Sequence, residues 1–247
     1  MNLNEQVVLI TGGAGGLGQA MCRTFAEHGA RVVVGYRSSS KAAEKLAAEL
    51  SGKGHSAKLA PVEDSAQLAY LASDIEKEYG RLDILINNAG ITRFVAHGDL
   101  DGLDDDLIDD IFRTNWRGAF ACVRAMRTLL DDVNGGLVIN ISSIAGATAM
   151  GSNIAYCASK AAMNTMTMSL ARALAPGIRV VSLSPGLAET DFVTGLDQDW
   201  WHEQSRRTPL GRLASPADVA AAALAIASGL TFSNGCIIPV DGGRPLT

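Results

Sequence analysis

Short apolar runs alternate with helical segments along the whole chain, and this alternation limits the fold more than any other feature. Runs with the length and composition of buried strands lie at residues 6–10, 31–35, 57–60, 82–86, 137–141, 180–183 and 236–240. Helical patterns separate them at residues 17–26, 40–50, 66–79, 105–130, 155–174 and 216–228. Such alternation favours right-handed crossovers and one parallel sheet, buried between helices on both faces. We therefore predict a single doubly wound α/β domain over residues 1–247, with about seven parallel strands.

Composition narrows the class of partner. The chain of 247 residues is 47% hydrophobic and has a net charge of −5. With no lysine–arginine cluster, this balance argues against nucleic acid as the main partner. The four cysteines show no CxxC spacing, and the four scattered histidines predict no metal site. The longest apolar run, residues 219–227, is too short to cross a bilayer, and no signal peptide precedes the first strand, so we expect a soluble cytoplasmic protein.

A glycine-rich turn follows the first strand directly and opens the first helix. It reads Thr11-Gly12-Gly13-Ala14-Gly15-Gly16-Leu17-Gly18. Glycines let the backbone approach a pyrophosphate, and a helix N-terminus offers free N–H groups and the positive end of its dipole. Between a strand and a helix at the start of the chain, the turn predicts a dinucleotide site of the Rossmann type.

Tyr156 and Lys160 lie at i and i+4 of a predicted helix, so they should share one face. A free phenol has a pKa of roughly 10. A neighbouring ammonium favours the phenolate and would lower that pKa, which would let Tyr156 exchange a proton with an alcohol oxygen. Ser143 offers a second hydroxyl to hold that oxygen. Taken alone, the pair more often indicates a half-buried tyrosine with a lysine snorkelling beside it.

These motifs, in their order, resemble the short-chain dehydrogenase/reductase family over nearly the whole chain. The glycine-rich turn is followed by Asn87-Asn88-Ala89-Gly90, Asn115, Ser143, Tyr156, Lys160, Pro185-Gly186 and Thr190. The resemblance implies that Tyr156 is the general acid/base and that Ser143 hydrogen-bonds the substrate oxygen. It implies that Lys160 lowers the Tyr156 pKa and contacts the nicotinamide ribose. Asn115 would hold a water that links Lys160 to solvent; the alternative is a helix-interior asparagine that bonds its own backbone.

The same resemblance assigns the cofactor contacts. They fall on Thr11, Gly12, Gly15, Gly16, Leu17, Gly18, Tyr36, Arg37, Ser38, Val62, Asn88, Ala89, Gly90, Tyr156, Lys160, Pro185, Gly186 and Thr190. NAD-using members usually carry an acidic residue after the second strand, where this chain has Tyr36 and Arg37, and we expect no carboxylate there to repel a 2′-phosphate.

Arg37 and the serine hydroxyls after it could bind that phosphate, so we expect NADP(H) rather than NAD(H). The alternative is an exposed arginine without a role. Two departures count against NADP(H). Gly15 stands where many NADP-using relatives have a basic residue, and Pro61 replaces the aspartate that typically contacts the adenine.

The sequence constrains the identity of the substrate less than that of the cofactor. Phrases such as Pro209-Leu210-Gly211-Arg212 look most like the 3-oxoacyl-carrier-protein reductase branch, but sugar and small-alcohol dehydrogenases share them. Acidic or neutral residues at 131–135 and 175–177 argue against docking of an acidic carrier protein. We expect residues of about 190–208 to form a substrate lid. Its aromatic side chains favour an apolar or ring-containing substrate, or equally a subunit interface; they are Phe192, Trp200 and Trp201.

The leading hypothesis is therefore an NADPH-dependent carbonyl reductase that acts on a small molecule. The resemblance also implies a homotetramer, with the long helix that carries Asn115 and the last helix and strand at its interfaces. One alternative is an NAD(P)-dependent dehydrogenase that oxidises a sugar or secondary alcohol. An alternative of another class is a non-catalytic dinucleotide-binding sensor.

Overall fold

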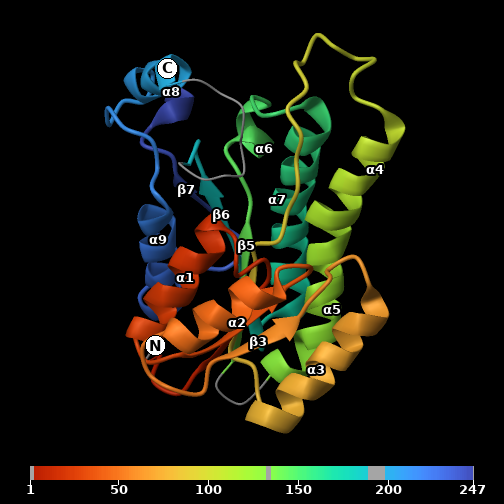
Figure 1. The fold of residues 1–247 in the computed structure, drawn as a ribbon, viewed down its shortest axis with the longest axis vertical. Helices are drawn as coiled ribbons and strands as arrows, with labels where there is room; N and C mark the ends of the chain where they lie inside the picture. The colour runs from red at the N-terminus through yellow and green to blue at the C-terminus, as the bar shows by residue number, and fades with distance from the viewer. Residues whose placement is uncertain (1–2, 132–134, 189–197, 247) are drawn as a thin grey trace.

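The computed structural model describes residues 3–131, 135–188 and 198–246, which form layers around one seven-stranded sheet (Figure 1). The strand order is β3-β2-β1-β4-β5-β6-β7, and the paired strands are parallel. The strands are β1 (Val7–Ile10), β2 (Arg31–Tyr36), β3 (Ser56–Leu59), β4 (Ile84–Asn87), β5 (Gly136–Ile141), β6 (Ile178–Pro185) and β7 (Ile237–Val240). The order reverses between β1 and β4, so the predicted doubly wound sheet is confirmed.

Helices cover both faces of the sheet. They are α1 (Gly16–Glu27), α2 (Ser40–Glu49), α3 (Ser65–Tyr79), α4 (Asp105–Phe112), α5 (Ala119–Leu130), α6 (Ala145–Thr148), α7 (Ile154–Leu174), α8 (Gln198–Arg206) and α9 (Pro216–Ser228), with a π-helix η1 (Arg113–Gly118) and a 3-10 turn η2 (Arg244–Leu246). Side chains of α1, α2 and α9 form the core on one face, and those of α3, α5 and α7 form the core on the other. No helix among the described residues is both long enough and apolar enough to span a membrane.

Burial of the strands follows their place in the sheet. Every residue of β1, β4 and β5 is buried, as their continuous apolar runs predict. The edge strands β3 and β7 contain exposed residues, so the expectation that all seven runs are buried on both faces is wrong for them. An edge strand has a neighbour on one side only and is less completely covered by helices.

The helix predicted over residues 105–130 is three elements in the structure. α4 and α5 are separated by η1, a π-helix that contains Asn115. Apolar periodicity does not reveal such an interruption, because the helical segments on both sides keep their own amphipathic pattern. The short helices α6 and α8 were also not predicted.

The start of α9 is stabilised by its own first residues. Ser215 is the N-cap, and Pro216 occupies the first helical position. The Ser215 hydroxyl accepts a hydrogen bond from the Asp218 N–H at 3.2 Å, and the Asp218 carboxylate accepts one from the Ser215 N–H at 2.8 Å. This reciprocal capping box fixes the end of α9 that faces the C-terminal residues.

Candidate active site

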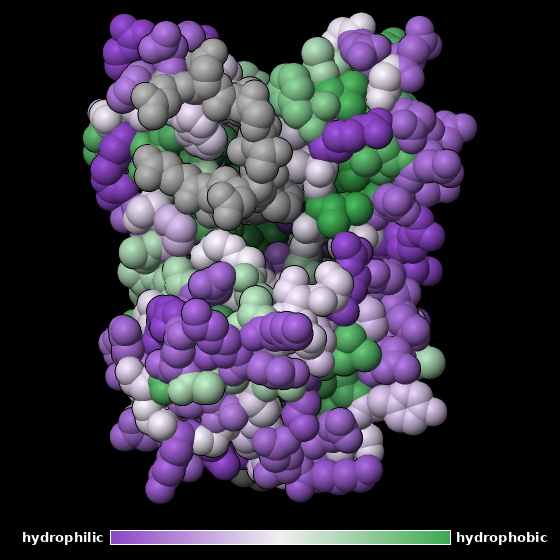
Figure 2. Space-filling model, in the orientation of Figure 1, coloured by the Kyte–Doolittle hydropathy of each residue, from purple (hydrophilic) through white to green (hydrophobic). Residues whose placement is uncertain are grey.

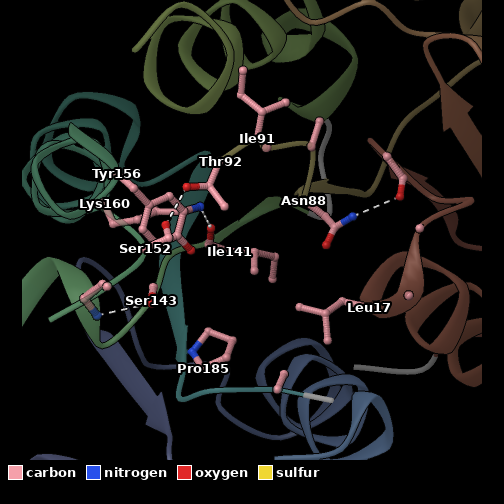
Figure 3. A pocket seen from close by; sticks show the side chains of 18 of the residues that line it. Leu17, Asn88, Ile91, Thr92, Ile141, Ser143, Ser152, Tyr156, Lys160 and Pro185 are labelled. Atoms are coloured by element: carbon pink, nitrogen blue, oxygen red, sulfur yellow. Dashed lines mark hydrogen bonds between the residues drawn. The ribbon is translucent and has the colours of Figure 1, made fainter. Parts of the chain in front are cut away.

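A cavity of about 730 Å³ opens at the carboxyl ends of the strands, where the strand order reverses (Figure 3). A doubly wound sheet leaves a crevice at this point, and the volume is that of a typical small-molecule site. In Figure 2 the molecular surface is notched between the part that carries α8 and the part that carries α6. Figure 3 shows Leu17 and Asn88 on one side of the cavity and Tyr156, Lys160 and Ser143 on the other, with Pro185 below.

The glycine-rich turn is held by close packing and by hydrogen bonds to the end of β4. Gly12 has φ +62°, and a Cβ on Gly18 would lie 2.3 Å from the Gly12 carbonyl oxygen, so glycine is needed at both positions. The Thr11 hydroxyl accepts hydrogen bonds from the backbone N–H groups of Asn88 and Ala89, both at 3.0 Å. The Asn88 side chain donates to the Thr11 carbonyl at 2.9 Å. The turn is thereby fixed beside β4 with its backbone open to the cavity.

Most of the residues predicted to bind cofactor come together on the cavity wall. Those that line it are Gly12, Gly15, Gly16, Leu17, Tyr36, Arg37, Ser38, Val62, Asn88, Ala89, Gly90, Tyr156, Lys160, Pro185 and Gly186. Thr11 and Gly18 lie behind the wall and shape the turn. Thr190 and Phe192 lie outside the described residues. The small residues and exposed backbone of the turn fit a pyrophosphate, so the cavity can hold a dinucleotide.

The start of α7 fixes the position of Tyr156. Asn153 is the N-cap: its side-chain oxygen accepts from the Tyr156 N–H at 2.7 Å, while its side-chain nitrogen donates to the Arg93 carbonyl at 2.7 Å. One side chain thus ties α7 to the loop after β4. Sequence reasoning did not single out Asn153, although asparagine just before a helix is a recognisable cap.

Lys160 is 5% exposed and shares a helix face with Tyr156, as predicted. Its Nζ donates to the Ile141 carbonyl at 2.8 Å and lies 5.6 Å from the centroid of the Tyr156 ring. Burial disfavours the charged ammonium and lowers the pKa of Lys160 to about 8. The side chain is therefore still largely protonated at neutral pH but loses its charge more readily than an exposed lysine.

Burial also raises the pKa of Tyr156 to about 12, while its hydrogen bond with Ser143 acts in the opposite direction. The net shift of this pKa is therefore opposite to the expected one, while the contribution of Lys160 stays a prediction. The reason is that removing the phenolate from water costs more than the nearby groups return. Ser143 lines the cavity together with Tyr156, and its own hydroxyl accepts a hydrogen bond from the Ala145 N–H at 3.1 Å.

Asn115 lies behind the cavity wall and links three segments. Its side-chain oxygen accepts from the Ile91 N–H at 2.8 Å, and its side-chain nitrogen donates to the Ile91 carbonyl at 3.1 Å and to the Ser159 hydroxyl at 3.2 Å. It does not bond its own helix, so that alternative is wrong. A Cβ on Gly90 would lie 3.3 Å from the Asn115 Oδ1 and 3.9 Å from the Lys160 Nζ, which shows how close these groups are. The water-mediated link to Lys160 stays a prediction.

A carboxylate in the cavity wall opposes the positive charge of Arg37. Its Nη1 lies 3.3 Å from the Oε1 of Glu63, which follows β3 and lines the same cavity. The other oxygen of Glu63, Oε2, is buried and has no hydrogen-bond partner in the part of the chain that the structure describes. The expectation that no carboxylate would stand near a 2′-phosphate is therefore wrong. Glu63 lies 26 residues from Arg37, and no local pattern joins them.

The cavity wall also contains three large apolar side chains and two arginines. They are Phe94, Met150, Trp200, Arg207 and Arg244. Trp201 packs edge-on against Trp200, with ring centroids 5.2 Å apart, and is absent from the described cavity wall. Of the two tryptophans, Trp200 lines the cavity, and the lid itself stays a prediction. The two arginines were not predicted.

Comparison with known proteins agrees with this geometry. The family model described as short chain dehydrogenase matches residues 6–200. The cis-4-hydroxycyclohexanecarboxylate dehydrogenase of Sinomonas cyclohexanicum is 36% identical over 243 residues, which cover 97% of this chain and 96% of that protein. A 3-oxoacyl-acyl-carrier-protein reductase of Staphylococcus aureus is 32% identical over 239 residues, or 95% of this chain and 96% of that protein. The crystal structure of a 3-ketoacyl-acyl-carrier-protein reductase from Brucella melitensis complexed with NADH has a TM-score of 0.90 at 30% identity, covering 98% of this chain and 99% of that chain.

Proposed function

Because this chain belongs to the short-chain dehydrogenase/reductase family and is an oxidoreductase, we propose that it uses NADP(H) to reduce a small ketone or 3-oxoacyl compound to an alcohol. The observation that carries the proposal is the convergence of Ser143, Tyr156 and Lys160 on the cavity wall that also contains the glycine-rich turn. A non-catalytic sensor would need the turn but has no use for all three of these side chains together.

Each of these side chains has a separate task in the proposed reaction. The reduced nicotinamide supplies the hydride when bound. Tyr156 donates the phenolic proton to the carbonyl oxygen, and the Ser143 hydroxyl holds that oxygen in place. The ammonium of Lys160, 5.6 Å from the Tyr156 ring centroid, stabilises the phenolate left behind. Asn115 holds the water that links Lys160 to solvent, and Tyr156 regains its proton through this link.

Tyr156 serves either direction of the reaction, because the phenol donates a proton in ketone reduction and the phenolate accepts one in alcohol oxidation. Burial raises the pKa of this phenol to about 12 and favours the protonated form. The ratio of reduced to oxidised cofactor sets the net direction, so the alternative, oxidation of a sugar or secondary alcohol, is tested beside reduction.

A substrate panel tests the proposal. NADPH consumption is followed spectrophotometrically with a 3-oxoacyl thioester and 4-oxocyclohexanecarboxylate, chosen for the activities named for the two similar proteins, and with simple ketones. Sugars and secondary alcohols with NADP⁺ test the oxidative direction. Turnover of a ketone that disappears in Tyr156→Phe supports a reductase. Cofactor binding without turnover of any carbonyl or alcohol supports the sensor instead.

Arg37 and Ser38 support NADP(H) as the preferred cofactor, because a guanidinium and a hydroxyl suit a phosphate. Glu63 opposes this preference, since its carboxylate already pairs with Arg37 and would repel the 2′-phosphate. We therefore expect only a small margin over NAD(H). Dissociation constants for NADPH and NADH, measured by fluorescence, test it: Arg37→Asp should shift the preference towards NADH, and an unchanged NADPH affinity would contradict the assignment.

We also propose a cytoplasmic homotetramer with a substrate lid at about residues 190–208. Exposed aromatic side chains support two interfaces: Trp116 stacks on Phe120 at 6.3 Å on the surface of η1 and α5, and Phe232 is fully exposed near β7. The four free cysteines suit a reducing compartment. The mass in solution, measured by light scattering, tests the assembly, and Phe120→Glu should lower it.

A further inference from the structure

Two hydroxyls from segments 60 residues apart form a pair in the cavity wall. Thr92 follows β4 and Ser152 precedes α7, and both residues are half-buried. Their side-chain oxygens lie 2.5 Å apart, and either oxygen can be the donor. Figure 3 shows both residues on the same side of the cavity as Tyr156. The proposed reaction assigns no task to these two hydroxyls.

Backbone contacts fix the segment that carries Ser152 beside Tyr156. The Val95 N–H donates to the Ser152 carbonyl at 2.8 Å, which ties this segment to the loop after β4. A Cβ on Gly151 would lie 3.2 Å from the Cδ1 of Tyr156, so the backbone next to Ser152 packs against the edge of the phenol ring. The hydroxyl pair is therefore held close to the proposed proton donor.

The side chain of Asn153 determines how the hydroxyl pair is hydrogen-bonded. Asn153 is fully buried, and its side-chain oxygen accepts from the Tyr156 N–H, so its other terminal atom is the nitrogen with two hydrogens. This nitrogen donates to the Arg93 carbonyl at 2.7 Å and to the Thr92 hydroxyl at 3.3 Å. Towards Asn153, the Thr92 oxygen can therefore act only as an acceptor.

A count of hydrogens shows that the pair has one donor to spare. Each hydroxyl has one hydrogen, and one of the two forms the bond between the oxygens. The other cannot point to the Asn153 nitrogen, which is itself a donor, and no other described residue contacts either hydroxyl oxygen. Donation in sequence from Asn153 to Thr92 to Ser152 strengthens each bond and leaves the spare hydrogen on Ser152. The wall thus offers one O–H group to a ligand.

The complement of this donor is an acceptor oxygen on the substrate. In the proposed reaction, the reacting carbonyl oxygen is already bound by Tyr156 and Ser143, so the pair calls for a second oxygen. We propose that the substrate carries a second acceptor oxygen close to its ketone, as the ester or thioester carbonyl of a 3-oxoacyl compound does, and that the hydroxyl pair of Thr92 and Ser152 binds it. The inference rests on the proposed reductase function, which supplies the ketone.

Two ketones that differ in the second oxygen test the inference on the full-length protein. They are ethyl 3-oxobutanoate and 2-heptanone, which has the same chain length without the ester oxygens. Because the ester also activates the ketone, the ratio of the two kcat/KM values is compared between variants. The double variant Thr92→Val/Ser152→Ala should lower this ratio about fivefold, the effect of one lost hydrogen bond. Ser152→Ala alone should do the same, since its hydroxyl holds the spare hydrogen.

The ratio separates substrate binding from a purely structural role. Thr92→Val leaves a buried hydrogen of Asn153 without its acceptor, and any resulting shift of Tyr156 would slow both ketones equally. Thr92→Ser keeps the hydroxyl and should keep the ratio. Ser169→Ala is the matched control, because it removes an exposed hydroxyl from α7 outside the described cavity wall. An unchanged ratio in the double variant would overturn the inference and leave the reductase standing.

A binding measurement separates failure of this inference from failure of the proposed function. If neither ketone is turned over, the reductase proposal fails, and binding of both compounds, followed by ligand-observed NMR, still probes the hydroxyl pair. Binding of ethyl 3-oxobutanoate that is about fivefold weaker in the double variant and unchanged in Ser169→Ala supports the site. Equal binding of this ester to both variants, or no binding to the wild-type protein, overturns it.

Discussion

At the proposed catalytic end of the cavity, Tyr156 and Lys160 come from one helix and lie among buried groups, each with a defined position. At the proposed nucleotide-selecting end, Arg37 and Glu63 come from loops after two different strands and meet across 26 residues of sequence. Lys160 is 5% exposed, whereas the Arg37 side chain is 56% exposed. Burial dominates the protonation of the first pair, while water screens the charges of the second.

This difference in burial shows at which end of the cavity the chain tolerates substitutions. A buried hydroxyl or ammonium cannot be replaced without altering proton transfer or stability, so substitutions at the catalytic end should act steeply. A half-exposed ion pair can be weakened, shared or reversed at a cost of about 1 kcal/mol. Cofactor preference should therefore be adjustable by single substitutions that leave the chemistry intact.

Tyr156→Phe is the substitution from which we expect the largest effect on activity. Removing the phenolic proton donor should lower kcat for ketone reduction by about 10³-fold, in the range that general acid catalysis supplies. The aromatic ring remains, so the NADPH dissociation constant should stay within about twofold. Both are measured on the same preparation, by steady-state kinetics and by fluorescence. A kcat within tenfold of wild type would mean that another group donates the proton.

The glycine-rich turn joins the two ends and offers a matched pair of substitutions. In Gly18→Ala the new Cβ would lie 2.3 Å from the Gly12 carbonyl oxygen, whereas in Gly15→Ala the nearest atom would be 3.4 Å away. We expect Gly18→Ala to lower the free energy of unfolding by about 3 kcal/mol and to weaken cofactor binding. Gly15→Ala should be nearly neutral for stability. Equal losses in urea denaturation would show that the packing contact is not the cause.

Lys160→Met separates stability from function at the catalytic end. The folded pKa of about 8 lies below the ordinary 10.5, so the unfolded chain binds the proton more tightly and the charged form costs stability at every pH below about 8. This cost fades as pH rises from about 8 to 10.5. We expect the variant to unfold with a free energy higher by about 1–3 kcal/mol at pH 7, with the gain shrinking above pH 8, while activity falls.

Urea denaturation of both proteins between pH 6 and pH 10 gives this comparison. A difference in unfolding free energy that does not change with pH would show that the lysine charge is not its source. A less stable variant at pH 7 would show that the hydrogen bond from Lys160 to the Ile141 carbonyl outweighs the cost of burying the charge.

Glu63→Gln is the mildest change and addresses the nucleotide-selecting end alone. It removes the carboxylate that pairs with Arg37 while keeping the side-chain size, so Arg37 becomes available to a 2′-phosphate. NADPH affinity should rise about tenfold and NADH affinity should change little. Glu49→Gln is the control, because Glu49 pairs with Arg23 at 3.0 Å in another part of the surface. Equal shifts for both cofactors would remove Glu63 from the selectivity argument.

Features that depend on residues close together in the chain were predicted correctly from the sequence. The strand–helix alternation predicted the sheet, and the Tyr156–Lys160 spacing predicted a shared helix face. The sequence did not predict the Arg37–Glu63 pair or the Thr92–Ser152 pair, because those contacts depend on how distant segments pack. The direction of the Tyr156 pKa was also missed, since a motif shows which charges are neighbours but not how deeply they are buried.

The π-helix η1 sets the rotational phase between α4 and α5. Each residue of an α-helix turns the chain by about 100°, and the wider π turn accommodates a residue that a regular helix would have to place elsewhere. Asn115 thereby faces inward to Ile91 while Trp116 remains partly exposed. Deleting one residue from Arg113–Gly118 would let a regular helix replace the π turn while α4 and α5 keep nearly the same phase. The loss would fall on the buried polar contact, because the local widening that turns Asn115 towards Ile91 would be gone.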